Sequence, residues 1–303
     1  MATAREIRRR IQSIRNLGQV TRALQAVAAS KVRKAQAAAL ATRAYSHAAW
    51  EIVVNLGAAT GGTLHPLLTC PTSVDSAIIV LITGDRGLCG AYNHNIVRAA
   101  LDFAHELRVP VRYITVGRRG RDILWRMRAE IVAEFHGLPA AISLADVSAI
   151  ARAAIQEFLE GRADKVYVAR TDFVNMLVHR PVIQRLLPLR PTELDTQVMM
   201  ECVIDLKPAH VVDYIYEPDA ATILEAVLPR FTELQVYQAV LEAQASEFAA
   251  RMVAMRNATD NAGMLVDDLT LVYNKARQRA ITREILDIAG GAEALAQTLA
   301  AAA

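Results

Sequence analysis

Residues 76–83 read Ser-Ala-Ile-Ile-Val-Leu-Ile-Thr, and Gly-Asp-Arg-Gly-Leu-Cys-Gly follows at once as residues 84–90. The first segment is a short apolar run, which predicts a buried strand. The second is a glycine-rich turn, and we expect a helix after it over residues 93–107. A strand, a tight turn and a helix in this order make the opening unit of an α/β domain.

The same alternation continues downstream. We predict a strand over residues 111–116, a helix over residues 144–160 and a further strand over residues 165–170. Strands that alternate with helices are typical of a mostly parallel sheet with covering helices. The sequence therefore predicts a Rossmann-like α/β domain over residues 75–217.

The first and last segments of the chain, residues 1–57 and 219–303, carry a helical pattern instead. Pro229 is a favourable first-turn residue, and no proline follows it. In the first segment a near-3.5-residue spacing joins Ile7, Ile11, Ile14, Gly18, Thr21, Gln25, Ala28, Val32, Ala35 and Ala39. In the last segment it joins Leu234, Tyr237, Leu241, Gln244, Phe248, Met252, Met255, Thr259, Ala262, Val266, Leu269, Val272 and Ala276, and Ile281, Ile285 and Ile288 extend it.

These two helices would be roughly 80 and 90 Å long, since an α-helix rises 1.5 Å per residue. One runs towards the middle domain and the other runs away from it, so seams that meet must be antiparallel. The predicted fold class is thus α/β, with a long antiparallel coiled coil of N- and C-terminal helices and the Rossmann-like domain between them. Such a stalk offers a long surface to partners and little concave surface for catalysis.

Charge is distributed unevenly along the chain. Residues 1–43 hold ten Lys or Arg and one acid, for a charge of +9, although the whole chain carries only +3. A basic arm of this kind indicates an acidic partner, a polyanion or a solvated helix face. A basic coiled coil that binds nucleic acid is the corresponding rival hypothesis. The acids Asp260, Asp267 and Asp268 on the last helix count against it.

Several classes of site are disfavoured by composition. Cys70, Cys89 and Cys202 are scattered, and the histidines show no ligand spacing, which indicates a reduced compartment and no structural metal. The longest clear apolar run covers residues 77–82, far short of the ~20 that cross a bilayer. The basic N-terminus lacks the hydrophobic stretch of a secretory signal, and its resemblance to a transit peptide is outweighed because helical periodicity begins at Ile7.

The glycine-rich turn stands where a Rossmann phosphate loop would stand. Its spacing is G-x-x-G-x-x-G, which is neither the dinucleotide fingerprint nor a P-loop, and the chain has no Gly-Lys dipeptide. We therefore interpret Asp85, Arg86 and Gly87 as structural, and disfavour the rival hypothesis of a dinucleotide enzyme with helical dimerisation arms. Cys89 with His94 as its base is a candidate nucleophile, but a packed cysteine is the preferred interpretation.

Two polar stretches interrupt the last helix. Residues 251–263 include poor helix formers, which indicates a local kink, a cap or a polar contact face. Residues 273–284 concentrate long polar side chains within a few turns. They are either solvated or bound to a partner, and Arg277 could pair bidentately with a carboxylate.

These segments together resemble the gamma-subunit family of F-type ATP synthases. The matching words occur in the family's order over nearly the whole chain: residues 4–11, 20–24, 27–36, 83–90 with Asn93, 235–237, 251–255, 258–261, 271–278 and 280–284. The resemblance implies a rotor axle that is not itself catalytic, needs no cofactor or metal, and couples proton flow through a c-ring to ATP synthesis.

The resemblance also implies the partners. One copy would stand inside a ring of three alpha and three beta subunits, with its foot on the c-ring and the epsilon subunit. The complex would lie peripherally on the cytoplasmic face of a bacterial plasma membrane, without nucleic acid.

Individual residues match the family's contact positions. Those facing the alpha/beta ring are Arg251, Arg277, Gln278, Thr282, Glu284 and Leu24, and those of the c-ring and epsilon foot are Tyr214, Tyr216 and Glu217. Leu24 departs from the methionine of many relatives, and Arg279 and Arg283 add charge. The two-cysteine insertion of chloroplast forms is missing.

Overall fold

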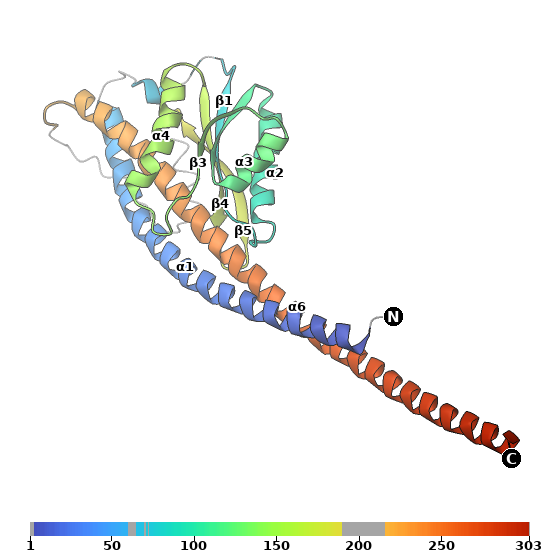
Figure 1. Cartoon of the computed structure of the whole chain (residues 1–303). Coiled ribbons are helices and arrows are strands. Elements are labelled where there is room, and N and C mark those ends of the chain that lie inside the picture. Colours follow the sequence, from blue (N-terminus) through green and yellow to red (C-terminus); the bar gives the residue numbers. More distant parts are fainter. Residues whose placement is uncertain (1–2, 60–64, 70, 72, 190–215, 303) are drawn as a thin grey trace. The chain divides into compact units, whose positions relative to one another are not determined.

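The computed structural model describes residues 3–59, 65–69, 71, 73–189 and 216–302. They form two compact units, residues 28–253 and residues 1–27 with 254–303. Helices α1 (Ala4–Ala59) and α6 (Ala220–Ala302) each contribute to both units (Figure 1). The finer division at residues 1–57, 75–217 and 219–303 stays a prediction.

Residues 28–253 contain a five-stranded sheet of order β3-β2-β1-β4-β5. Strand β1 (Ala77–Ile82) is buried along its whole length and pairs in parallel with both neighbours, as central strands of parallel sheets do. The other strands are β2 (Val111–Val116), β3 (Ile131–Phe135), β4 (Lys165–Phe173) and β5 (His179–Leu187). Only β5 is antiparallel, so the predicted mostly parallel sheet is confirmed.

Helices cover both faces of the sheet (Figure 1). On one face α2 (Tyr92–Leu107) and α3 (Arg118–Arg126) bury Ile96 and Leu124 in an apolar cluster. On the other face α4 (Leu144–Leu159) and the beginning of α6 bury Ile150 and Leu228 in a larger one. The predicted Rossmann-like layering is therefore present.

Parts of this unit went unpredicted. Helix α3, strands β3 and β5 and the 3-10 helix η1 (Pro66–Leu68) were not expected. Helix α6 starts at Ala220, so Pro229 lies inside the helix and not in its first turn. A proline inside a helix removes a hydrogen bond. Here its neighbours Leu228 and Phe231 are buried in the core, which holds the helix in place.

In residues 28–253, α1 and α6 also pack on each other. Val32 and Ala35 join Ala245, Phe248 and Ala249 in one apolar cluster. The ammonium of Lys31 lies 5.3 Å from the centre of the Phe248 ring, a cation–π contact.

In the second unit the two helices run antiparallel. Thr21 and Thr259 share a hydrogen bond of 2.7 Å between their hydroxyl oxygens, and a Cβ at Gly18 would lie 3.4 Å from that of Ala262. All ten predicted seam positions of α1 are buried or half-buried. The seam of α6 is likewise inward-facing as far as Leu269. Further along, Ile281, Ile285 and Ile288 are exposed.

Candidate functional site

The glycine-rich loop, residues 84–90, leaves the carboxyl end of β1 beside the end of β2. Thr83 fixes this junction, because its backbone N–H donates to Val116 O (2.7 Å) and its hydroxyl accepts from the Gly120 N–H (2.9 Å). Gly117 has a φ of +99°, and a Cβ there would lie 2.1 Å from the Thr83 carbonyl oxygen. Only glycine permits that approach, so the loop starts from a rigid base.

Asp85 reaches from the glycine-rich loop to the N-terminus of α3. Its Oδ1 accepts the N–H of Arg118, the first residue of α3 (3.1 Å), and its Oδ2 accepts the N–H of Gly137 (2.8 Å). A helix N-terminus at the end of a parallel strand attracts anions. A phosphate placed here would meet the chain's own carboxylate, which disfavours a nucleotide site.

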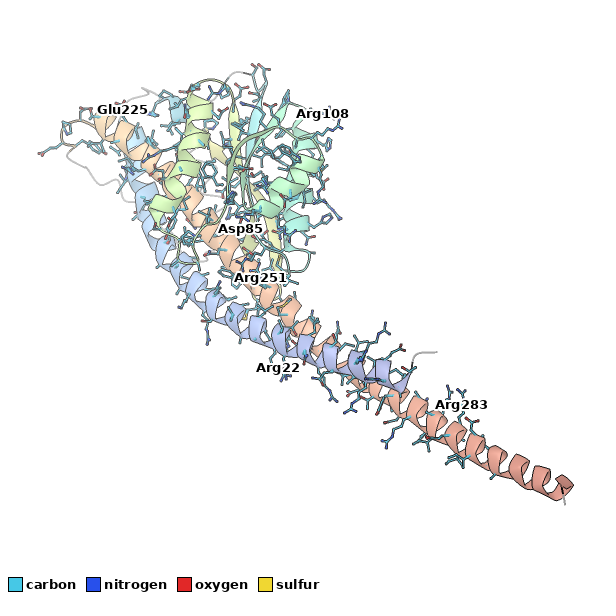
Figure 2. All side chains as sticks on the ribbon, viewed as in Figure 1. Arg22, Asp85, Arg108, Glu225, Arg251 and Arg283 are labelled. Atoms are coloured by element: carbon cyan, nitrogen blue, oxygen red, sulfur yellow. The ribbon has the colours of Figure 1, made fainter. Side chains whose placement is uncertain are left out.

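Helix α6 crosses this loop with a charged pair. Arg251 Nη2 lies 2.5 Å from Glu247 Oε1 and faces the carbonyl oxygens of Arg86 (3.5 Å) and Gly87 (3.4 Å). In Figure 2 the labels Asp85 and Arg251 mark the loop side and the helix side of this contact. Burial raises the pKa of Glu247, and the neighbouring Arg251 partly offsets that rise.

A cavity of about 400 Å³ lies between the loop and the helix. Its charged lining is mixed and includes the basic Lys31, Arg86 and Arg251 and the acidic Asp85 and Glu247. Nothing in this lining pairs a nucleophile with a base. Among the described residues, no group of His, Cys, Asp and Glu side chains could hold a metal ion.

Cys89 is a packed cysteine in this structure. Its side chain is buried, Asn93 Nδ2 lies 3.1 Å from its Sγ, and burial raises the pKa of the thiol. A raised pKa keeps the thiol protonated and a poor nucleophile. The proposed base His94 contacts Arg98 (3.1 Å) on its own helix.

The predicted ring-contact residues are not all together. Arg277, Gln278, Thr282 and Glu284 are exposed on a short stretch of α6, where the Thr282 hydroxyl donates to Gln278 O. Leu24 on α1 is 36% exposed. Arg22 and Arg283, labelled in Figure 2, also belong to the unit of residues 1–27 and 254–303. Arg251 differs, since it belongs to the other unit and only 17% of its side chain is exposed.

The predicted foot residues lie before α6. The Tyr216 hydroxyl donates to Asn55 O (3.5 Å), Glu217 is exposed, and Tyr214 lies outside the described residues. No helix in the described part of the chain combines the length and apolarity needed to cross a membrane.

Sequence reasoning missed Glu247. It is one acid in an alanine-rich stretch, and its partners at residues 84–87 are remote in sequence. The available signal was its i,i+4 spacing from Arg251, which places both side chains on one face of a helix.

Comparison with known proteins gives a consistent answer. Residues 3–295 match a family model described as ATP synthase. The ATP synthase gamma chain of Dehalococcoides mccartyi (strain CBDB1) is 47% identical over 298 residues, covering 98% of this chain and 100% of the relative. That of Roseiflexus castenholzii is 46% identical over 301 residues, with the same coverages.

Two solved structures share the fold. One is the rotor of the Euglena gracilis mitochondrial ATP synthase, at a TM-score of 0.61 and 20% identity, covering 92% of this chain and 98% of that chain. The other is the central stalk and c-ring of the Tetrahymena thermophila mitochondrial ATP synthase, at 0.60 and 24%, covering 79% and 99%. From the full-length family match and the relatives above 40% identity, the chain belongs to the family of ATP synthase gamma chains.

Proposed function

We propose that this chain is the central-stalk rotor subunit of an F1Fo ATP synthase. It couples proton flow through the c-ring to ATP synthesis at the alpha/beta catalytic sites by rotation, and it catalyses no reaction itself. The observation that carries the proposal is the second half of α6, which exposes apolar and charged side chains along its length.

Rotation works on the ring through unequal contacts. Near its end, α6 exposes the apolar Ile281, Ile285 and Ile288 together with the basic Arg279 and Arg283. A turning helix with different faces presents each catalytic unit with a different surface in succession. A conformational equilibrium shifts only by the difference in contact free energy between its states, and an asymmetric helix supplies such a difference.

The ring contacts follow from exposure and charge. Arg277, Gln278, Thr282 and Glu284 would meet loops of the three beta and three alpha subunits, and Leu24 would contribute from α1. Arginine pairs with carboxylates bidentately, so acidic loops are the expected counterpart of Arg277. Arg251 would join these contacts only through the small part of its side chain that is exposed.

The predicted foot residues would bind the other partners of the rotor. Tyr216 and Glu217, with Tyr214, would contact the c-ring and the epsilon subunit. The chain would thus be a peripheral component on the cytoplasmic face of a bacterial plasma membrane, present once per complex. The bacterial sources of the closely matching gamma chains support that location.

The test is a pull-down of the tagged chain from detergent-solubilised membranes, with native mass and an ATPase assay. We expect a complex that holds three alpha and three beta copies per tagged chain and hydrolyses ATP. The variant Arg277→Glu should lower ATP-driven proton pumping, while Arg256→Gln on the same helix should leave it unchanged. A free monomer or homodimer under gentle conditions would refute the rotor proposal.

A further inference from the structure

The pair Glu247 and Arg251 makes a directed contact between α6 and the glycine-rich loop. Arg251 Nη2 bonds Glu247 Oε1 (2.5 Å) and faces the carbonyl oxygens of Arg86 and Gly87. Hydrogen bonds with a charged partner are strong and directional. The Glu247 bond lies within α6 and holds the guanidinium in place, while the two carbonyl contacts of Arg251 join the helix to the loop.

The fit of the loop to this pair is close. A Cβ at Gly84 would lie 2.6 Å from Glu247 Oε1, so any larger residue would displace the carboxylate. The backbone N–H of Gly84 is meanwhile held by Asn93 Oδ1 (2.8 Å). The loop thus offers a bare backbone surface on which the carboxylate rests, and carbonyl oxygens for the guanidinium beside it.

We propose that Glu247 and Arg251 lock α6 to the loop of residues 84–90, and that this joint transmits torque between the α/β domain and the helix. Glu247 is a positioning residue, which aims Arg251 at the loop carbonyls. The inference rests on the proposed rotor function and gives the family's glycine-rich signature a mechanical role.

The position of the joint supports this role. Other ties hold α6 to the domain further back along the helix: the Arg170–Glu242 ion pair (2.8 Å), the Tyr92 hydroxyl on Ala243 O (2.9 Å) and the Gln244 amide on Pro139 O (3.2 Å). Arg251 is the last of the series and stands two residues before Val253, where this compact unit ends. Among these ties, Arg251 is therefore the one nearest to the part of α6 that lies beyond this unit.

The chemistry of the Arg251 contact suits the transmission of torque. Apolar contacts are non-directional, so a helix held by them alone can slide or turn at little cost. The Arg251 guanidinium, held by Glu247 on its own helix, faces two loop carbonyl oxygens, and these directional contacts oppose both motions. Lys31 of α1 contacts Phe248, the residue after Glu247 on α6, and this contact further restrains α6.

The first experiment uses the full-length chain alone. Amide hydrogen exchange of residues 84–90 is compared in wild type, Glu247→Gln, Arg251→Gln and the double variant. The matched control is Arg256→Gln, which removes an exposed i,i+4 pair with Asp260 from the same helix. We expect Arg251→Gln to raise the rate of amide exchange in the loop roughly tenfold, because the loss of one hydrogen bond to a charged group makes local opening of the loop easier by about that factor.

The geometry also predicts how the exchange rates of the variants should differ from one another. Glu247→Gln should have a smaller effect, because Arg251 keeps its carbonyl acceptors. The double variant should resemble Arg251→Gln, since the two side chains act as one unit. Independent, additive effects or unchanged exchange would overturn the joint.

The second experiment tests torque in the reconstituted complete ATP synthase in vesicles. We expect Arg251→Gln to lower protons pumped per ATP hydrolysed about twofold or more against a proton gradient, as expected when a charged contact is lost. Arg251→Lys should restore part of the ratio, and Arg256→Gln should match wild type.

The exchange and pumping experiments together distinguish the ways in which the inference could fail. Faster loop exchange with normal pumping would reduce the joint to a purely structural tie. Poor pumping with unchanged exchange would place Arg251 on a partner subunit instead. Either result overturns the inference. Failure of the wild-type chain to assemble or pump would reject the rotor function itself, while the exchange experiment would still report on the joint.

Discussion

The two halves of α6 share one sequence pattern but differ in environment. Leu228, Val236 and Ala249 in the first half are fully buried against the chain's own sheet and α1. Ile285 and Ile288 in the second half continue the apolar spacing, yet they are 60% and 69% exposed. The periodicity determines which side of the helix is apolar, but not which molecule covers it.

The two halves of α6 therefore contribute to different properties, the first to stability and the second to partner binding. Burial in the first half stabilises the fold, whereas the exposed side chains of the second half contribute little to folding and are accessible to partners. Apolar side chains presented together on a surface are typical of interaction sites. Substitutions in the two halves should therefore act on different measurements.

The largest effect is expected for core truncation. Leu228→Ala should lower the free energy of unfolding by about 2–5 kcal/mol, because it removes a fully buried side chain and leaves a cavity. Ile285→Ala should change it by less than about 0.5 kcal/mol. Denaturant titration of the isolated chain measures both. Equal losses would mean that the second half of α6 is covered within the chain.

A buried ion pair should come next. Arg170 and Glu242 form a 2.8 Å pair between β4 and α6, with side chains 14% and 4% exposed. Arg170→Gln should cost about 3 kcal/mol of unfolding free energy, since it removes the charge of Arg170 from the buried Glu242 carboxylate.

The part of α6 beyond Val253 supplies the control. Arg256 and Asp260 are 72% and 68% exposed at 4.0 Å. Arg256→Gln should therefore change the unfolding free energy by less than about 0.5 kcal/mol. A loss as large as that of Arg170→Gln would contradict the contrast between the two halves.

The contrast also explains what could be predicted from the sequence. The seam from Ile7 to Ala39 follows from spacing alone, because an amphipathic helix repeats its buried face every three or four residues. Helix α3 was missed because its nine residues carry four arginines and only one buried apolar side chain longer than glycine's, that of Leu124. Strand β5 was missed because Pro181 and half-exposed side chains hide its pattern at the sheet edge.

The site was less predictable than the fold for a different reason. The loop was recognised, but its contact with Glu247 joins residues more than 150 positions apart. No local pattern encodes which helix crosses a loop. Arg251 was singled out as a partner contact, and only the tertiary arrangement reveals its bonds within the chain.

Glycine replacement gives a smaller effect, of opposite sign in the glycine-rich loop and in α6. A Cβ at Gly84 would displace the Glu247 carboxylate, so Gly84→Ala should cost about 1–3 kcal/mol. Gly263 lies inside α6 with nothing within 4 Å, so Gly263→Ala should stabilise the helix by about 0.5–1 kcal/mol. Thermal unfolding of both variants measures the difference. Stabilisation by Gly84→Ala would refute the close approach.

The smallest effect is a pH dependence in the first half of α6. Burial raises the pKa of Glu247 above its ordinary value of 4.5. As pH rises through that value the unfolded chain loses this proton before the folded chain does. The group's stabilising contribution is therefore complete below pH 4.5 and is lost as pH rises through the folded pKa. Glu247→Gln should remove this loss, so its stability should fall less steeply with rising pH than that of wild type.

Asp146 provides a control of opposite sign. Hydrogen bonds from the Ser143 hydroxyl and backbone hold the pKa of Asp146 below its ordinary value of 3.8. Its contribution is present above pH 3.8 and is lost as pH falls through the folded pKa. In a plot of unfolding free energy against pH, Asp146→Asn should therefore flatten the acid side. Glu247→Gln should flatten the region above pH 4.5. If Glu247→Gln instead steepened the fall with rising pH, the Arg251 pairing would outweigh burial, and the joint would be a net stabilising ion pair at neutral pH.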